Sequence, residues 1–271
     1  MVSLPCLTAS AKQVAKNADG RQLSESPADD MTPRFFVKTA LYRTAPFIFE
    51  RYRLAHRQRQ LSESPSHGVE GGVWQEHGSV RVRKYSNYEE YIRHQSSKFA
   101  GMLARGGFKG RIIAKNRLMF RRHFLLATPS LSPDAKIVCA AARDGTEVEV
   151  WRDLGFKDAI GFDLYPGPNN QFVIAGDFHK MPFEAGSVDL LFCNSLDHAL
   201  DLDKFFQEAA RVLKPSALAL IDLTDQETGA GPWEATEWAH AQDVLDIALK
   251  RFSAIVSTQQ DGIWKSTLLR N

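Results

Sequence analysis

From residue 136 onward, short apolar runs alternate with segments in which apolar residues recur at helical spacing. The runs predict seven strands, at 136–140, 159–163, 171–175, 188–193, 217–223, 253–258 and 263–269. The segments between them predict helices at about 146–155, 202–213 and 235–251. This alternation is typical of a sheet with helices on both faces, so we expect an α/β, Rossmann-like domain with a seven-stranded, mostly parallel sheet.

The preceding part of the chain has the pattern of separate helices. Residues 44–60 predict one helix, with Pro46 in its first turn. After a glycine-rich linker, Ser86 and Glu89 form a capping box before apolar residues at helical spacing, which predicts a second helix that ends at Gly106-Gly107.

These patterns predict three regions. Residues 1–30 contain few large apolar side chains and are expected to be disordered. Residues 31–130 are expected to form a basic, helical N-terminal extension, and residues 131–271 the α/β domain. The string RQLSESP occurs at 21–27 and again at 59–65, which indicates a local duplication and makes Met31 an alternative start.

The net charge of +2 conceals a division of the chain into two parts. Residues 31–123 carry 19 basic and 6 acidic side chains, a net charge of +13, and the remainder carries −11. A basic segment of this kind faces an anionic partner, which can be a nucleic acid, a membrane surface or the acidic part of the same protein. The sequence leaves these three alternatives open.

Composition favours a soluble protein that remains in the cytoplasm. The chain has 271 residues, 44% of them hydrophobic, and no apolar run approaches the roughly 20 residues that span a bilayer. Its three cysteines are far apart, without the paired spacing of a metal or redox site. We therefore expect a reducing compartment and no metal.

The stretch VCAAARDGTEVEV, at 138–150, follows the first predicted strand of the sheet. Ligands in such sheets bind beyond the carboxyl ends of the strands, where small residues let the backbone approach them. Ala140, Ala141, Ala142 and Gly145 are small, and we expect alanine to serve where φ is negative. Asp163, at the end of the second strand, is placed to accept hydrogen bonds from a ribose, although NAD enzymes share this pattern.

Four pieces of sequence between Lys136 and Leu223 narrow the choice: ARDGTEV, IGFDLYPG, GDFHKMPFEAGSVDLLFCNSLDHALD and FFQEAARVLKPSALALIDL. Together they resemble the class I S-adenosylmethionine-dependent methyltransferases of the type 11 kind. The resemblance implies S-adenosyl-L-methionine as cofactor, with Asp177 at the adenine amino group, Phe178 beside the ring, Asn194 near the methionine part and His198 on the acceptor side. The other residues implied at the site are Ala141, Arg143, Gly145, Asp163, Leu164 and Asp197.

The first loop departs from the family pattern. The acid that ends the first strand is replaced by Cys139, and two of three glycines by Ala141 and Arg143. The methionine ammonium group therefore lacks its usual carboxylate. Glu147 is a candidate substitute, although an acid at a helix N-terminus is equally explained by the helix dipole. Arg143 faces either the methionine carboxylate or solvent.

Several implied residues have a structural alternative. Asp177 is also suited to capping the turn before Met181, and Asn194 to satisfying loop backbone groups. His198 is either structural or the general base, as the group best placed to titrate near neutrality, with Asp197 to orient it. The two cysteines of the predicted strands, Cys139 and Cys193, are expected to be small core residues.

We therefore expect transfer of a methyl group to a small-molecule, sugar or lipid-linked acceptor. The alternatives are a nucleic-acid methyltransferase that uses the basic segment, which no recognisable module supports, and a non-catalytic scaffold that keeps the fold. Aromatic and basic residues alternate between Phe35 and Arg53, which is consistent with peripheral contact with an anionic membrane or with packing on the acidic domain. The oligomeric state is left open.

Overall fold

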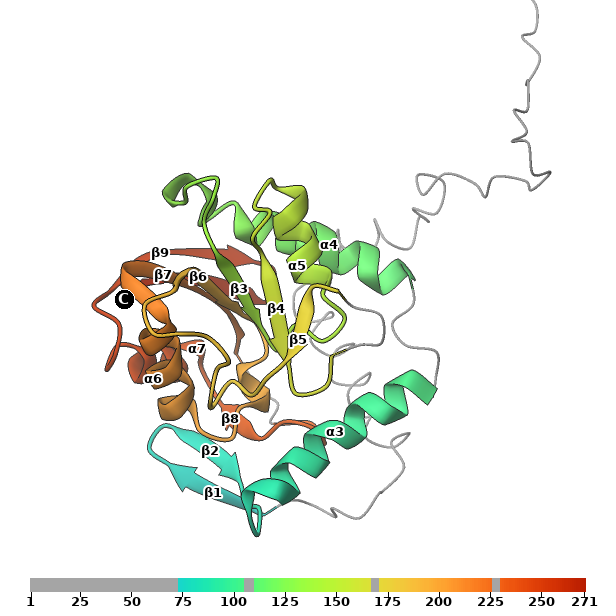
Figure 1. Cartoon of the computed structure of the whole chain (residues 1–271). Coiled ribbons are helices and arrows are strands. Elements are labelled where there is room, and N and C mark those ends of the chain that lie inside the picture. The colour runs from blue at the N-terminus through green and yellow to red at the C-terminus, as the bar shows by residue number, and fades with distance from the viewer. Residues whose placement is uncertain (1–72, 105–109, 167–170, 226–229) are drawn as a thin grey trace, which may run out of the picture. The chain divides into compact units, whose positions relative to one another are not determined.

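The computed structural model describes residues 73–104, 110–166, 171–225 and 230–271 (Figure 1). The disorder predicted for 1–30, the helix predicted at 44–60, both RQLSESP copies and the segment from Phe35 to Arg53 lie outside these ranges. In the described part of the chain, no helix has the length and apolar character needed to cross a membrane.

A seven-stranded sheet forms the centre of the described structure, and all seven strands predicted from the sequence are present (Figure 1). Five of them pair in parallel and the last two pair antiparallel. In spatial order the strands are β5 (Val173–Ala175), β4 (Ile160–Asp163), β3 (Ile137–Ala140), β6 (Val188–Cys193), β7 (Leu213–Thr224), β10 (Trp264–Arg270) and β9 (Ala254–Asp261).

The strand order reverses between β3 and β6. After β3 the chain adds β4 and β5 on one side, and then returns to place β6 on the other side of β3. Loops that leave neighbouring strands in opposite directions open a crevice at the carboxyl edge of a sheet. The stretch singled out in the sequence, 138–150, lies at this switch point, and its loop comprises residues 141–145.

Alternate residues of the central strands enter two different cores. Val138 and Ala140 of β3 belong to one buried cluster, and Ile137 and Cys139 belong to the other. This period of two is the geometry of a strand that is buried on both faces. Cys139 and Cys193 are fully buried, which confirms them as core residues.

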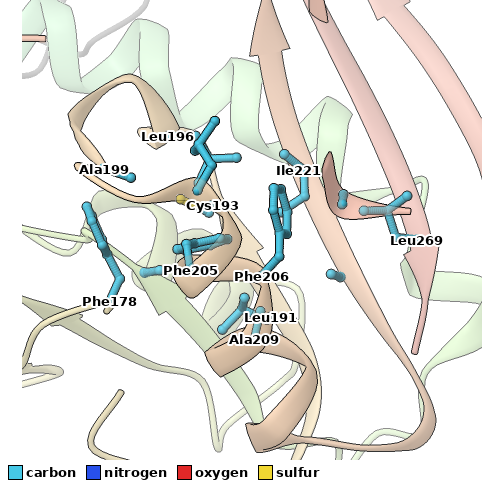
Figure 2. Close-up of a cluster of buried hydrophobic side chains, with 14 of the residues drawn as sticks. Phe178, Leu191, Cys193, Leu196, Ala199, Phe205, Phe206, Ala209, Ile221 and Leu269 are labelled. Atoms are coloured by element: carbon cyan, nitrogen blue, oxygen red, sulfur yellow. The ribbon is translucent and has the colours of Figure 1, made fainter. Parts of the chain in front are cut away.

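Helices cover both faces of the sheet (Figure 1). On one face, α6 (Leu202–Val212) and α7 (Ala241–Ala248) supply Phe205, Phe206 and Leu245 to the first cluster. Figure 2 shows Phe205 and Phe206 of α6 beside strand residues of this cluster. On the other face lie α4 (Gly110–Phe124) and α5 (Thr146–Asp153).

Helix α4 joins the basic part of the chain to the sheet. The ring of Phe124 stacks on Trp151 of α5 at 4.0 Å between centroids and meets Phe192 of β6 edge-on at 4.8 Å. At the helix surface, Arg117 pairs with both Glu149 and Asp153 of α5. Apolar and ionic contacts therefore hold this basic helix against the acidic part of the chain.

A second, three-stranded sheet was not predicted. It consists of β1 (Trp74–His77), β2 (Val80–Arg83) and β8 (Thr236–Trp238), all antiparallel.

This sheet leads to two corrections of the predicted elements. The described part of the extension contains a β-hairpin as well as helices, and the helix predicted at 235–251 is a strand followed by the shorter helix α7, which begins after His240. Residues 236–238 form a strand because they pair with β2, which is remote in sequence. Such tertiary pairing can override the helical pattern of the local sequence.

The helix predicted after residue 86 is α3 (Tyr88–Ala104), and its cap lies one residue later than expected. The Asn87 side chain accepts a hydrogen bond from the Glu90 amide (2.9 Å), and the Glu90 carboxylate accepts one from the Ser86 amide (2.5 Å). Asn87, rather than Ser86, is therefore the capping side chain, and Glu90 reaches back to the amide of the residue before the cap. The predicted end at Gly106-Gly107 lies outside the described residues.

Candidate active site

The loop between β3 and α5, residues 141–145 and called here the first loop, has an unusual backbone. Three alternate residues have positive φ: Ala141 (56°), Arg143 (33°) and Gly145 (76°). The expectation that alanine occupies positions of negative φ is therefore wrong at Ala141. Residues other than glycine are strained in this region, at a cost of roughly 1–2 kcal/mol each.

Close packing fixes the first loop against β4. A side chain at Gly161 would approach the Ala142 Cβ atom to 2.6 Å, so glycine is required there for the loop to lie this close. The Ala142 amide donates to the Phe162 carbonyl (3.0 Å), and the Gly145 amide donates to the Ala142 carbonyl (2.6 Å). The strained conformation is thus held by its surroundings.

Asp163 lies at the carboxyl end of β4 and is 7% exposed. Its carboxylate accepts hydrogen bonds from the Arg143 amide (3.1 Å) and the Tyr165 amide (2.8 Å), and the Arg143 Nε atom is 4.0 Å away. Burial raises the pKa of Asp163 above its usual value. The structure therefore brings the first loop and Asp163 together, as predicted, with half-buried Leu164 next in the chain.

Asp177 is held by two partners that the sequence analysis did not identify. Its carboxylate accepts hydrogen bonds from the His179 amide (2.8 Å), from the His179 ring (3.1 Å) and from the Tyr88 hydroxyl of α3. Burial opposes ionisation of Asp177, but these hydrogen bonds outweigh it, and the pKa is lower than usual. The Lys180 amide also donates to the Asp177 carbonyl (3.0 Å), so the turn-capping role that the sequence left open is present.

Phe178 points away from Asp177 into the core. It is 5% exposed and meets Phe205 edge-on at 5.8 Å between centroids (Figure 2). This position favours core packing for the ring over contact with a ligand. Asn194, after β6, is half-buried, and its side-chain oxygen accepts a hydrogen bond from the Ser195 hydroxyl (3.0 Å).

His198 ends a short 3-10 helix, Leu196–His198, and both of its ring nitrogens are engaged. Nδ1 lies 3.1 Å from the Trp233 carbonyl and therefore carries the proton, which leaves Nε2 to accept from the Lys98 amine at 2.7 Å. Burial, followed by the charge of Lys98, lowers the pKa of His198 to about 3. The expectation that His198 titrates near neutrality is therefore wrong, because its ring is neutral at pH 7.

Lys98 of α3 is the main residue of the site that sequence reasoning missed. Burial lowers the pKa of its amine, and the carboxylate of Asp197 acts in the opposite direction. Arg143 and Asp163 also act on this amine, which places Lys98 beside the first loop. A signal was available in the sequence, because Lys98 lies three residues after Gln95 and seven after Tyr91, on the predicted buried face of the helix.

Further contacts tie α3 to the loop that carries His198 and tie both α3 and β2 to residues 230–235. Tyr91 donates to the His198 carbonyl (3.0 Å), and Gln95 donates to the Trp233 carbonyl (2.9 Å). The His94 ring stacks on Trp233 at 5.4 Å. On β2, Arg83 donates to the carbonyls of Gly231 (3.1 Å) and Glu234 (2.9 Å). We call β1, β2, α3 and residues 230–238 the cover, because they pack over the loop that carries His198.

Comparisons with known proteins agree with this geometry. Residues 138–221 match the family model described as a methyltransferase domain. No curated protein matches the chain in sequence. The solved Burkholderia thailandensis 1,6-didemethyltoxoflavin-N1-methyltransferase, with bound 1,6-didemethyltoxoflavin and S-adenosylhomocysteine, has a TM-score of 0.55 at 14% identity, over 73% of this chain and 98% of that one.

Two further solved structures were compared. A Thermotoga maritima S-adenosylmethionine-dependent methyltransferase, described as a possible histamine N-methyltransferase, gives a TM-score of 0.42 at 15% identity, over 58% of this chain and 94% of that one. The PH0226 protein of Pyrococcus horikoshii gives a TM-score of 0.45 at 20% identity, over 56% of this chain and 90% of that one. Residues 138–221 therefore match a methyltransferase domain, and the chain shares the fold of the Burkholderia enzyme.

Proposed function

We propose that the protein transfers the methyl group of S-adenosylmethionine to a small-molecule, sugar or lipid-linked acceptor. The observation that carries the proposal is the position of Asp163. Its buried carboxylate accepts a hydrogen bond from the backbone of the first loop, at the switch point of the sheet. S-adenosylmethionine supplies, when bound, a methyl group that its sulfonium already activates. The protein is then required mainly to hold two reactants in line, which contributes roughly 7–11 kcal/mol in favourable cases.

The cofactor side of the site uses the first loop and two acids. Asp163 binds the ribose hydroxyls, with Leu164 beside the sugar, and Ala141, Arg143 and Gly145 bring backbone close to the methionine end. Asp177 accepts a hydrogen bond from the adenine amino group. The Tyr88 hydroxyl and the His179 ring hold the Asp177 carboxylate in place for this contact. Phe178 supports the same turn from within the core, and Asn194 lies on the methionine side.

The acceptor side combines His198, Asp197 and Lys98. A neutral His198 holds the Lys98 amine by its Nε2 atom, and the charge of Asp197 acts on the same amine. We therefore assign His198 and Asp197 the role of positioning Lys98, which binds the acceptor or takes its proton. Where the acceptor has a proton to lose, Lys98 in its neutral form would take that proton.

The cover favours a small acceptor over a nucleic acid. Residues 230–235 lie under α3 with at least five hydrogen bonds from β2 and α3, which leaves less room for a duplex or a folded RNA than an open crevice does. The basic residues that would bind phosphates are also engaged, since Arg81 pairs with Glu237 and Arg122 with Asp261. Packing on the acidic part of the chain accounts for these charges, and membrane contact through 35–53 stays a prediction.

Two measurements test the proposal. Isothermal titration of the full-length protein with S-adenosylhomocysteine is expected to give saturable binding. Incubation with methyl-labelled S-adenosylmethionine and a small-molecule extract is expected to label a compound that mass spectrometry can identify. Binding without any transfer would favour the scaffold alternative, and labelling of RNA in a parallel incubation would favour the nucleic-acid alternative. Absence of binding would contradict the proposal.

A further inference from the structure

Glu147 is a buried acid directly behind the first loop. It is the second residue of α5 and is 5% exposed, whereas Glu149, two residues later on the same helix, faces solvent. An acid at a helix N-terminus gains from the dipole without being buried, as Glu149 demonstrates in the same turn. The dipole therefore does not explain why Glu147 is turned inward.

The groups around Glu147 are mostly acidic. From the first loop, Asp144 and Arg143 act on its carboxyl group, and from β4 Asp163 does so. The thiols of Cys139 on β3 and Cys193 on β6 lie close enough to respond to its charge. Glu147 is thus buried behind the first loop, near the switch point of the sheet.

Neighbouring charges do little to favour ionisation of Glu147. Its own backbone amide and the charge of Arg143 favour the anion, and the charges of Asp144 and Asp163 oppose it. Burial, followed by the charges of Asp144 and Asp163, raises its pKa to about 8. A carboxyl group buried in this way is stable as the neutral acid, or as the anion once a cation arrives.

The cofactor carries such a cation at the end that reaches the first loop. The methionine part ends in an α-ammonium group, and the first strand offers Cys139 where an acid would otherwise meet it. The charge of Glu147 contributes to the raised pKa of the Cys139 thiol, which indicates that the Glu147 carboxyl group lies near the strand end that carries no acid.

We propose that Glu147 is the carboxylate that binds the α-ammonium group of the cofactor, and that it releases its proton to solvent when the cofactor binds. This inference rests on the proposed function. It makes cofactor affinity dependent on pH: binding strengthens as pH rises from 6 toward 8, because a growing share of the Glu147 carboxyl group is already ionised. Between pH 6 and pH 8 the expected gain is up to about 50-fold, if the bound carboxyl is ionised throughout.

The test is titration calorimetry of the full-length protein with S-adenosylhomocysteine at pH 7, in phosphate and in Tris. The difference in heat between the buffers counts protons released, and about 0.9 of a proton is expected for the wild type. Glu147→Gln keeps the shape of the neutral acid and is expected to release none and to bind roughly tenfold to 100-fold more weakly. Glu149→Gln, the same change on the exposed side of α5, is the matched control and is expected to behave as wild type.

A second ligand separates recognition from structure. 5′-Methylthioadenosine lacks the amino-acid part, so Glu147→Gln and wild type are expected to bind it within about twofold of one another. Loss of both ligands in Glu147→Gln would overturn the inference in favour of a structural role. Unchanged binding and proton release with S-adenosylhomocysteine would also overturn it, while the proposed function stands. A wild-type protein that binds neither ligand would overturn both.

Discussion

The two sides of the active site are built in different ways. Most of the proposed cofactor side comes from one continuous part of the chain, in which β3, the first loop, α5 and β4 succeed one another between 137 and 163, although Asp177 and Asn194 lie later in the chain. The acceptor side joins residues that are far apart, since Lys98 meets His198 across 100 residues and Arg83 meets Gly231 across 148. Local geometry thus shapes the cofactor side, and assembly of the cover shapes the acceptor side.

This difference matches the chemistry of the two sides. Methyltransferases of one family share a cofactor but differ in acceptor, so a fixed cofactor loop and a separate cover allow acceptor choice to change without disturbing cofactor binding. Segments that carry specificity on a rigid scaffold are common in proteins. If the two sides are independent, changes to one are expected to leave the other intact, and the following experiments examine that independence.

The largest effect is expected from the sheet that supports both sides. His123 of α4 is buried between Asp222 of β7 (2.6 Å) and Asp261 of β9 (3.2 Å). His123→Ala leaves Asp222 buried without its partner, and we expect a loss of roughly 3–5 kcal/mol in the free energy of unfolding. Urea denaturation measures it. A loss below 1 kcal/mol would mean that this buried cluster contributes little.

The same cluster predicts a dependence of stability on pH. Burial disfavours the charged His123, but the hydrogen bonds and charges of Asp222 and Asp261 outweigh burial and raise its pKa. A raised folded-state pKa stabilises the protein fully below the unfolded value of about 6.5, and this stabilisation is lost as pH rises through the folded value. Urea denaturation is expected to show this loss in the wild type and not in His123→Ala.

The next effect concerns the cofactor side alone. Asp163→Ala removes two charge-assisted hydrogen bonds to the ribose, and we expect S-adenosylhomocysteine to bind tenfold to several hundredfold more weakly, at about 1.5–3 kcal/mol for each bond with some replacement by water. Titration calorimetry measures the affinity, and a thermal melt controls for folding. Unchanged affinity would remove the ribose assignment.

A change on the acceptor side is expected to spare the cofactor. In Lys98→Met and His198→Ala, we expect methyl transfer to the labelled acceptor fraction to fall roughly 100-fold, while S-adenosylhomocysteine affinity stays within a few-fold. Because the His198 pKa is near 3, its ring adds no inflection to the pH–rate profile between pH 5 and pH 8. Equal losses of transfer and binding would show that the two sides are coupled.

The smallest effect tests the strain in the first loop. Ala141→Gly relieves an unfavourable φ of 56°, and we expect a gain of roughly 0.5–1 kcal/mol in the free energy of unfolding. Ala142→Gly is the matched control, because Ala142 is buried and its φ is not positive, so this change is expected to destabilise. Destabilisation by both changes to the same extent would contradict strain at Ala141.

The sequence was sufficient for the sheet and for the position of Asp163 beside the first loop. A strand that is buried on both faces of a sheet needs apolar residues at successive positions. Apolar runs of four to six residues therefore identify such strands before their neighbouring strands are known. The same reasoning failed at 235–251, where Thr236 and Trp238 acquire a ladder partner in β2. It also found that small residues line the first loop but not that Ala141 has positive φ, which close packing against β4 imposes.

By itself, then, the sequence determined the α/β class, the strand positions and the place of Asp163, because these depend on periodicity and on motifs within a few residues. Only the tertiary structure decided which charged groups lose contact with water. Burial of Glu147 depends on the packing of α5 behind the first loop, and neutrality of His198 and recruitment of Lys98 depend on surfaces contributed by remote segments. Since burial and neighbouring charge set the pKa of such groups, their chemistry follows from the assembled fold rather than from their position in the chain.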